Sequence, residues 1–141
     1  MNTIKQWGLA LAAVILAGCG PTAEQLVDAQ AASGMQTKGA LLLDIRDPDE
    51  YLESHAPGSL NIPFGRLSQR LAELESHKGK EVVVIDHAGV RAPRALELLQ
   101  KAGFTRVLVV KGGMLEWQAA KLPVEKPQPP AAEEEVLEEE E

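Results

Sequence analysis

The residues with the clearest potential for chemistry form a six-residue loop between an apolar, strand-like run and a helix-like run. They are Asp86, His87, Ala88, Gly89, Val90 and Arg91. A turn from a strand end into a helix start can point several backbone N–H groups inward, where the positive end of the helix adds to their field. Such a loop can bind an anion. Because Asp86 places a negative charge in the same loop, we predict that its carboxylate caps the loop amides itself.

Other polar residues near strand ends are expected to have structural roles. Asp44 and Arg46 lie two residues apart, and a buried ion pair is favoured over acid–base chemistry. His55 and Gly58 belong to one turn, in which His55 is expected to brace the loop rather than act as a base. The His87 side chain is expected to face solvent rather than serve as a ligand or base. The sequence shows no convincing cluster of metal ligands, and we predict neither a metal nor another cofactor.

The elements that must position this loop follow an alternating pattern. Three continuous apolar runs have the length of strands buried on both faces; they are residues 40–45, 81–86 and 106–110. Helices are predicted at residues 47–53, 92–102 and 114–120, with a helical leucine stripe over 67–74. This alternation predicts an α/β fold with a parallel sheet and right-handed crossovers. Ligands of such sheets bind at the carboxyl ends of strands, which is where the loop lies.

Two further segments complete the predicted domain. Thr22-Ala-Glu-Gln25 has the form of a capping box and predicts a helix through Ala32, followed by a loop from Ser33 to Gly39. Residues 59–63 are expected to form a brief extended segment.

Length and charge limit the classes of function. A chain of 141 residues with 45% hydrophobic content makes at most one ordinary globular domain. The net charge of −7 argues against a nucleic-acid partner. Seven of the 21 acidic residues lie between Glu133 and Glu141, which leaves 14 acids against 14 bases in residues 1–132. The folded part is therefore close to neutral.

The amino terminus has the pattern of a signal peptide. One early cation, Lys5, precedes an uncharged apolar run from Trp7 to Ala17, which is too short for a comfortable membrane span. Leu16-Ala-Gly-Cys19 resembles the lipobox of bacterial lipoproteins. The resemblance implies a signal peptide over residues 1–18, acylation of Cys19 and a short tether over 19–22. An ordinary secretory signal or short anchor with an incidental Cys is the alternative.

Acylation of Cys19 would have two consequences. Cys19 is the only cysteine of the chain, so the mature protein would have no free thiol. Two or more acyl chains, palmitate among them, would hold the domain stably at a membrane. Gly20 follows the cysteine, and in Gram-negative lipoproteins the absence of Asp there favours the outer over the inner membrane, facing the periplasm.

Residues 125–141 are predicted to be a proline-rich linker and an acidic tail. Four prolines lie between Pro123 and Pro130, and an acidic run interrupted only by Val136 and Leu137 follows. A solvated, disordered tail is the favoured interpretation; a tail that binds a partner or a cation weakly is the alternative.

Seven ordered landmarks resemble the rhodanese-like domain over residues 22–124. They are Leu42-Leu-Asp-Ile-Arg46, Glu50-Tyr51, His55-Ala-Pro-Gly58, Asn61-Ile-Pro63, the loop 86–91, Gly103-Phe104, and Gly112-Gly-Met-Leu-Glu-Trp117 with Leu122-Pro-Val124. The resemblance implies a central parallel sheet flanked by helices on both faces. Catalytic members of the family transfer sulfane sulfur from donors such as thiosulfate to acceptors such as cyanide.

The departure from the family lies at the decisive position. Catalytic rhodaneses open this loop with a Cys that becomes a persulfide, and here the position holds Asp86. A carboxylate cannot hold a persulfide, whereas a thiolate is nucleophilic and polarisable. Arg91 matches the loop arginine of the family, where it helps hold the anion or the loop; pairing with Asp86 or another local acid is an equal alternative. Ala92 stands where many catalytic members have Ser.

The sequence therefore predicts a membrane-anchored rhodanese-like lipoprotein without sulfurtransferase activity, an inactive homologue that serves binding or regulation at the cell envelope with a protein partner. The alternative is an active sulfurtransferase that uses a partner thiol or noncanonical chemistry of the loop. In a third hypothesis, the anchor and the acidic tail carry the function and the domain is a spacer.

Overall fold

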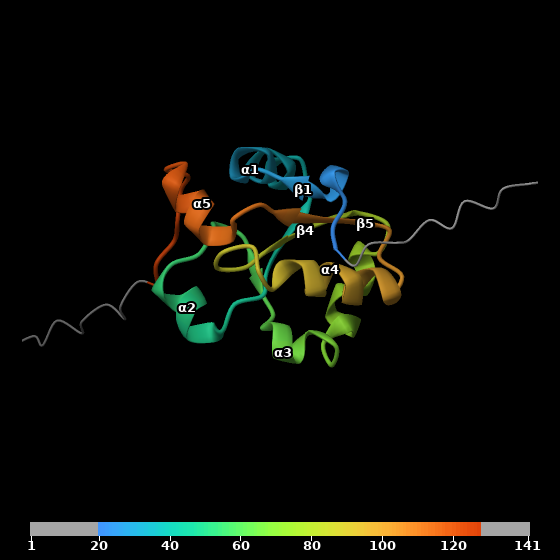
Figure 1. Cartoon of the computed structure of the whole chain (residues 1–141). Helices are drawn as coiled ribbons and strands as arrows, with labels where there is room; N and C mark the ends of the chain where they lie inside the picture. Colours follow the sequence, from blue (N-terminus) through green and yellow to red (C-terminus); the bar gives the residue numbers. More distant parts are fainter. Residues whose placement is uncertain (1–19, 128–141) are drawn as a thin grey trace, which may run out of the picture.

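Five parallel strands form one sheet in the computed structural model, which describes residues 20–127 (Figure 1). The strands are β1 (Leu26–Val27), β2 (Leu41–Asp44), β3 (Leu60–Asn61), β4 (Glu81–Ile85) and β5 (Arg106–Val110). Their order across the sheet is β1-β5-β4-β2-β3, and every neighbouring pair is parallel. Since all strands run the same way, the sheet has one amino edge and one carboxyl edge.

Helices cover both faces of this sheet, as the sequence predicts. Helices α1 (Ala29–Thr37) and α5 (Gly113–Ala119) share a buried cluster on one face. The other face is covered by α4 (Ala92–Lys101), α3 (Phe64–Leu67) and the 3₁₀ helix η2 (Leu71–His77). Figure 1 shows α1 on one side of the strands and α4 with α3 on the other. The short helix α2 (Pro48–Glu53) follows β2.

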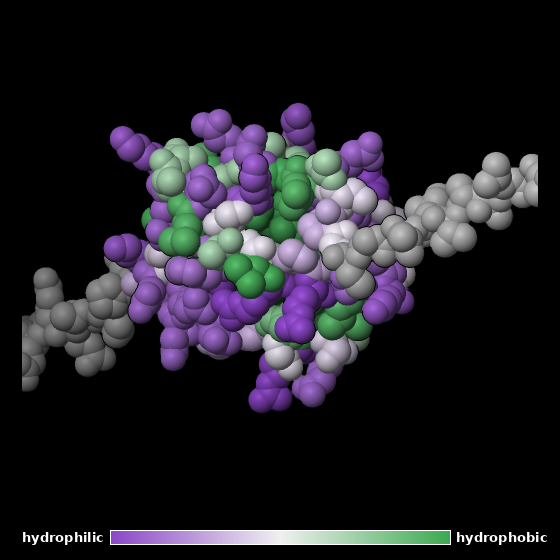
Figure 2. Space-filling model, in the orientation of Figure 1, coloured by the Kyte–Doolittle hydropathy of each residue, from purple (hydrophilic) through white to green (hydrophobic). Residues whose placement is uncertain are grey.

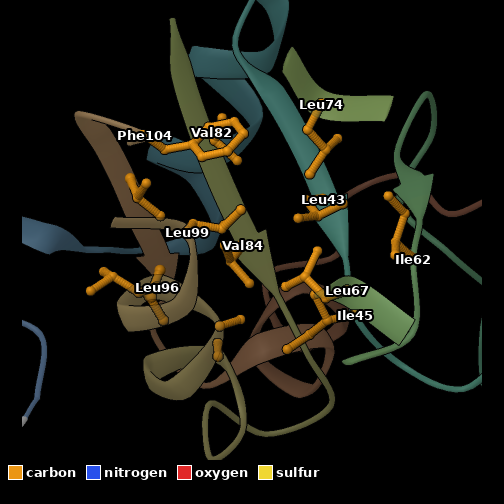
Figure 3. Packing of buried hydrophobic residues seen from close by; sticks show 14 residues of the cluster. Leu43, Ile45, Ile62, Leu67, Leu74, Val82, Val84, Leu96, Leu99 and Phe104 are labelled. Atoms are coloured by element: carbon orange, nitrogen blue, oxygen red, sulfur yellow. The ribbon is translucent and has the colours of Figure 1, made fainter. Parts of the chain in front are cut away.

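The apolar strand runs are explained by burial on both faces. In β4, Val82 and Val84 pack toward α4, whereas Val83 packs in the cluster of α1 and α5. Successive side chains of a strand point to opposite faces, so a central strand between two helical layers needs an apolar residue at every position. Figure 3 shows the α4 side, where Leu99 lies close to Val84 of β4 and Leu43 lies beside that strand on β2.

The amino-terminal helix prediction was wrong in its boundaries. The capping box of Thr22 and Gln25 forms, but it opens only a 3₁₀ turn, η1 (Ala23–Gln25). Leu26 and Val27 then pair with Val109 and Val110 of β5 as an edge strand. Helix α1 starts after Asp28, whose Oδ1 accepts the Ala31 N–H at 2.7 Å, and it continues through Thr37 where a loop was predicted. Pairing with a distant strand thus overrode the local helix signal.

The leucine stripe over residues 67–74 is also divided into two elements. Helix α3 ends at Leu67 and the 3₁₀ helix η2 begins at Leu71. Leu67 and Leu74 are nevertheless fully buried. The spacing of three residues between Leu71 and Leu74 suits a 3₁₀ helix, which has three residues per turn.

The remaining predicted elements agree with the structure to within a residue or two.

Within residues 20–127, no helix combines the length and the apolar character required to cross a membrane. The signal peptide and Cys19, and the acidic tail from Glu133, are predictions that lie outside the described residues.

Candidate functional site

The loop of Asp86 lies at the carboxyl edge of the sheet, between β4 and α4. The Asp86 side chain is buried and its carboxylate accepts three backbone hydrogen bonds. Oδ1 accepts from the N–H of Gly89 at 2.5 Å, and Oδ2 accepts from the N–H groups of Arg91 and Ala92 at 2.6 and 2.9 Å. This is the internal capping that the sequence predicts. Three of the amides that could hold an external anion are therefore already occupied by a side chain of the same loop.

A second contact fixes the loop from the side of α5. The Asp86 carbonyl accepts the Met114 N–H at 2.8 Å, and the His87 carbonyl accepts the Leu115 N–H at 3.0 Å. Gly113 has a φ of +58°, and a Cβ there would lie 2.5 Å from the Asp86 carbonyl oxygen and 2.7 Å from Oδ1. The loop and the start of α5 can approach this closely only because residue 113 has no side chain.

Arg91 pairs with helix α2 and not with Asp86. Its Nη2 lies 3.3 Å from Oε2 of Glu50, and its Nη1 lies 3.9 Å from Oδ2 of Asp47. Both acids also cap α2, since Asp47 is its N-cap and Glu50 completes the capping box. Of the roles considered for Arg91, the geometry shows pairing with a local acid. The loop is thereby tied to α2 as well as to α5.

Glu50 carries the electrostatic link between these elements. Partial burial acts to raise the pKa of Glu50, but the Asp47 N–H and the Arg91 guanidinium, with a smaller contribution from Arg46, outweigh it and the pKa is lowered. The His87 Nδ1 lies 3.7 Å from Oε1 of Glu50, and 55% of the His87 side chain is exposed. His87 therefore sits at the rim of the loop, largely in solvent.

Asp44 and Arg46 form a buried ion pair at the end of β2. The Arg46 Nη2 donates to Oδ2 of Asp44 at 2.7 Å, and Nε lies 3.1 Å from both carboxylate oxygens. The guanidinium also donates to the carbonyls of Glu50 and Ser54, at 3.3 and 2.9 Å. The bonds to Glu50 and Ser54 hold α2 against the end of β2, and none of these contacts reaches the loop amides.

His55 and Gly58 lie in the turn between α2 and β3. The His55 ring stacks on Tyr51 with centroids 3.8 Å apart, and its Nδ1 lies 2.8 Å from the Tyr51 carbonyl oxygen. Its Nε2 lies 3.4 Å from Oε2 of Glu125. Gly58 has a φ of +70°, which favours glycine in this turn. His55 thus braces both the turn and the segment that leaves the domain.

Two residues of this arrangement were not among the predicted site residues. Glu50 lies 41 positions before Arg91, and the sequence marked it only as part of the landmark Glu50-Tyr51. Gly113 was part of a predicted helix boundary, and the pair Gly112-Gly113 was the available signal. No group of three or more His, Cys, Asp or Glu residues within 20–127 is arranged to hold a metal ion.

The surface around the loop is mixed in character. Val90 at the loop tip is 77% exposed, and Leu115 on α5 is 50% exposed. Figure 2 shows hydrophobic groups as small, separate spots among hydrophilic ones on the visible face. Exposed apolar side chains are thus present on the loop itself and on the helix that holds it.

Comparison with known protein families and with individual proteins finds similar sequences. The family model of the rhodanese-like domain matches residues 23–120. The chain belongs to the rhodanese-like domain family. The uncharacterised protein YibN of Escherichia coli K12 is 36% identical over 86 residues, which are 60% of this chain and 60% of YibN. The chain thus covers less than two thirds of that relative.

Two relatives carry names that mention sulfur. A protein of Allochromatium vinosum named sulfurtransferase is 33% identical over 92 residues, 65% of this chain and 84% of that protein. The putative sulfur carrier protein YrkF of Bacillus subtilis is 37% identical over 76 residues, 54% of this chain and 40% of that protein.

Solved structures share the fold. The rhodanese-like domain of the Alr3790 protein from Anabaena sp. gives a TM-score of 0.66 at 27% identity, with 76% of this chain and 85% of that chain covered. A rhodanese-related protein from Thermoplasma volcanium gives 0.65 at 29% identity, with 72% and 97% covered. The parallel sheet and its flanking helices are therefore consistent with the family that the sequence match identifies.

Proposed function

We propose that this protein is a membrane-anchored rhodanese-like module without sulfurtransferase activity, which serves binding or regulation at the cell envelope. The observation that carries the proposal is the occupation of three loop amides by the Asp86 carboxylate. By resemblance to the family, Asp86 stands where catalytic rhodaneses have their cysteine. The loop of this chain therefore lacks the nucleophile, and three of the amides that would hold a transferred sulfur already bind the Asp86 carboxylate.

The anchor is proposed from the lipobox-like sequence that ends at Cys19. Acylation there would tether the domain through the few residues that precede Ala23, the first residue of η1. The protein would face the periplasm, with the outer membrane favoured over the inner. Acylation would also consume the only thiol of the chain.

The proposed partner is an envelope protein that contacts the loop face. Val90 offers a nearly free apolar side chain at the loop tip, and Leu115 is half exposed on α5. Charged groups of Glu50 and Arg91 lie beside the loop and could orient such a partner.

A second candidate function is favoured by the named relatives. Two similar proteins are named as a sulfurtransferase and a putative sulfur carrier. This chain could take part in sulfur transfer if a partner supplied the thiol, or through noncanonical loop chemistry. The Asp86 loop would then serve as a docking surface or as an unusual reaction site.

The deciding experiment is a thiosulfate:cyanide sulfurtransferase assay on residues 20–141, which contain no cysteine. We expect no activity from the parent protein and measurable activity from Asp86→Cys, because the new thiolate would face the loop amides. Asp49→Cys places a thiol on the exposed side of α2 and serves as the matched control, with no activity expected. Activity of the parent would overturn the proposal.

The anchor is tested separately in cells by metabolic labelling with palmitate and membrane fractionation. The full chain should incorporate label and sediment with membranes, whereas Cys19→Ser should do neither. Equal labelling of the two proteins would contradict acylation at Cys19.

A further inference from the structure

The amino edge of the sheet, opposite the Asp86 loop, gathers basic residues. They lie in the segments that lead into three neighbouring strands: Lys38 before β2, Lys78 and Lys80 before β4, and Lys101 and Arg106 at the end of α4 and the start of β5. Because β2, β4 and β5 are adjacent and parallel, these segments meet at one edge. The grouping comes from topology, since the five residues are spread over 69 positions of the chain.

Three of these cations are free to meet an external anion. Lys78 pairs with Glu75 at 2.9 Å and Arg106 pairs with Glu81 at 2.5 Å. Lys38, Lys80 and Lys101 are exposed and form no ion pair with another described residue. The five cations of this edge stand beside three carboxylates, those of Glu75, Glu81 and Glu24. The edge therefore carries a net positive charge in a chain whose total charge is −7.

A shallow cavity of about 370 Å³ lies among these residues. It is lined by Lys38, Gly39, Ala40, Gly79, Lys80, Glu81 and Arg106. The absence of side chains at Gly39 and Gly79 leaves the backbone accessible, and even a Cβ added at either residue would meet no other atom within 4 Å. A phosphate group there would meet the Lys38 and Lys80 side chains beside the ion pair of Arg106 and Glu81.

The chain enters the domain at the same edge. Glu24 and Gln25 lie beside Thr105 and Arg106, with which they line a second shallow cavity. In Figure 1 the segment that starts at residue 20 lies next to the end of α4 and the start of β5, and the loop before α4 lies at the other end of the sheet. Cys19 is the residue immediately before this segment.

We infer that the amino edge binds the surface of a membrane rich in anionic phospholipids and orients the Asp86 loop away from it. The inference rests on the proposed function, because the anchor at Cys19 would hold this edge at the membrane. Lys38 and Lys80 would contact lipid phosphates at the cavity, and Lys101 would add to the attraction. Each cation close to an anionic lipid surface strengthens association roughly fivefold. The loop would then face partners in the aqueous space.

The test is vesicle sedimentation with residues 20–141, which include the whole sheet, both buried clusters and the matched family region. Because this protein lacks Cys19, its binding does not depend on acylation. It should sediment at low ionic strength with vesicles that contain about one third phosphatidylglycerol, and not with pure phosphatidylcholine. Added salt should weaken binding, because it screens exposed charges.

Two triple variants of equal net charge are compared for their affinity for the vesicles. Lys38→Gln/Lys80→Gln/Lys101→Gln should lower vesicle affinity at least about tenfold. Arg66→Gln/Arg94→Gln/Lys111→Gln removes three exposed cations from the carboxyl side and should lower it less than about threefold. Far-UV circular dichroism checks that both variants are folded.

Three results would overturn the inference: equal loss in the two variants, equal sedimentation with the two kinds of vesicle, or binding to heparin without binding to phosphatidylglycerol vesicles. The last would assign the edge to a soluble polyanion. None of them would decide whether Cys19 is acylated or whether the loop transfers sulfur, since those questions have their own experiments.

Discussion

At the scale of single residues, Asp86 takes the place of two groups that are distinct in a catalytic rhodanese, the nucleophile and the anion bound by the loop. It stands at the position expected for the nucleophile, and it also acts as the anion that the loop amides bind. A buried carboxylate is costly unless hydrogen bonds compensate, and here three N–H donors do so. Asp86 is therefore a structural part of the loop.

Asp86→Ala should destabilise the domain by about 2–5 kcal/mol, because three loop N–H groups would lose a charged acceptor. Chemical denaturation of residues 20–141 measures the effect. Glu53→Ala on the exposed end of α2 is the control and should change the free energy of unfolding by less than about 0.5 kcal/mol. Acetate or sulfate should partly restore the stability of Asp86→Ala by occupying the vacated position. A change below about 1 kcal/mol would contradict the structural role.

The ion pair of Glu50 with Arg91 should make the stability of the domain depend on pH. The pKa of Glu50 is lowered in the folded protein, so its contribution to stability is present above the ordinary pKa of 4.5 and is lost as the pH falls through the lower folded value. Glu50→Gln should lower stability at pH 7 by less than about 1 kcal/mol, since the group is partly exposed. The difference between parent and variant should shrink below pH 4.5.

Denaturation curves at neutral and acidic pH measure this difference. Glu53→Gln is the matched control, because Glu53 lies in the same helix and forms no ion pair with another described residue. A Glu50→Gln effect that is constant with pH would contradict a role for the charge.

At the scale of elements, the loop depends on how closely α5 approaches it. Gly113→Ala should destabilise the domain by more than about 2 kcal/mol, because the new Cβ would clash with the Asp86 carbonyl at 2.5 Å and the φ of +58° disfavours a side chain. Gly34→Ala in α1 is the matched control. It has open space around its Cβ and should stabilise the protein by about 0.5–1 kcal/mol.

Thermal unfolding of the two alanine variants gives the comparison. Similar melting temperatures for Gly113→Ala and the parent would show that the loop can move away from α5 without cost.

Some elements could be predicted from the sequence because their signals are local. The strand 106–110 agrees residue for residue with β5, and α2 follows from Asp47 as its N-cap and Pro48 in its first turn. Strand β1 could not be predicted, since two residues carry no periodic pattern and their pairing with β5 spans more than 80 positions. The predicted boundaries of the first helix were wrong for the same reason, because β1 takes up residues that the prediction had assigned to that helix.

The site was predictable to a similar degree. The capping of the loop by Asp86 is a contact within six positions, so the sequence was sufficient to expect it. The partner of Arg91 lies 41 positions away, and many acids were available. Local chemistry could be predicted, whereas the choice among distant partners required the fold.

At the scale of the whole molecule, a parallel sheet makes the two ends of the domain chemically different. The carboxyl edge holds the buried Asp86 loop and the ion pairs of Arg91 with Glu50 and Asp47, and the amino edge gathers Lys38, Lys80 and Arg106 around a shallow cavity. The chain begins its folded part at the basic edge, with Glu24 beside Arg106. In this fold, the first described residues and the Asp86 loop lie at opposite ends of the sheet (Figure 1).

The burial of Trp117 gives this protein its own optical reporter. Its ring is 1% exposed, and its Nε1 donates to the Pro123 carbonyl at 2.9 Å from within the helix that holds the loop. The other tryptophan of the chain is Trp7, so a protein that begins at Gly20 has one indole. Its emission would move to longer wavelength when α5 leaves the sheet, because water would then surround the ring. Opening of the loop's support can thus be followed by intrinsic fluorescence, without a dye and without a cysteine.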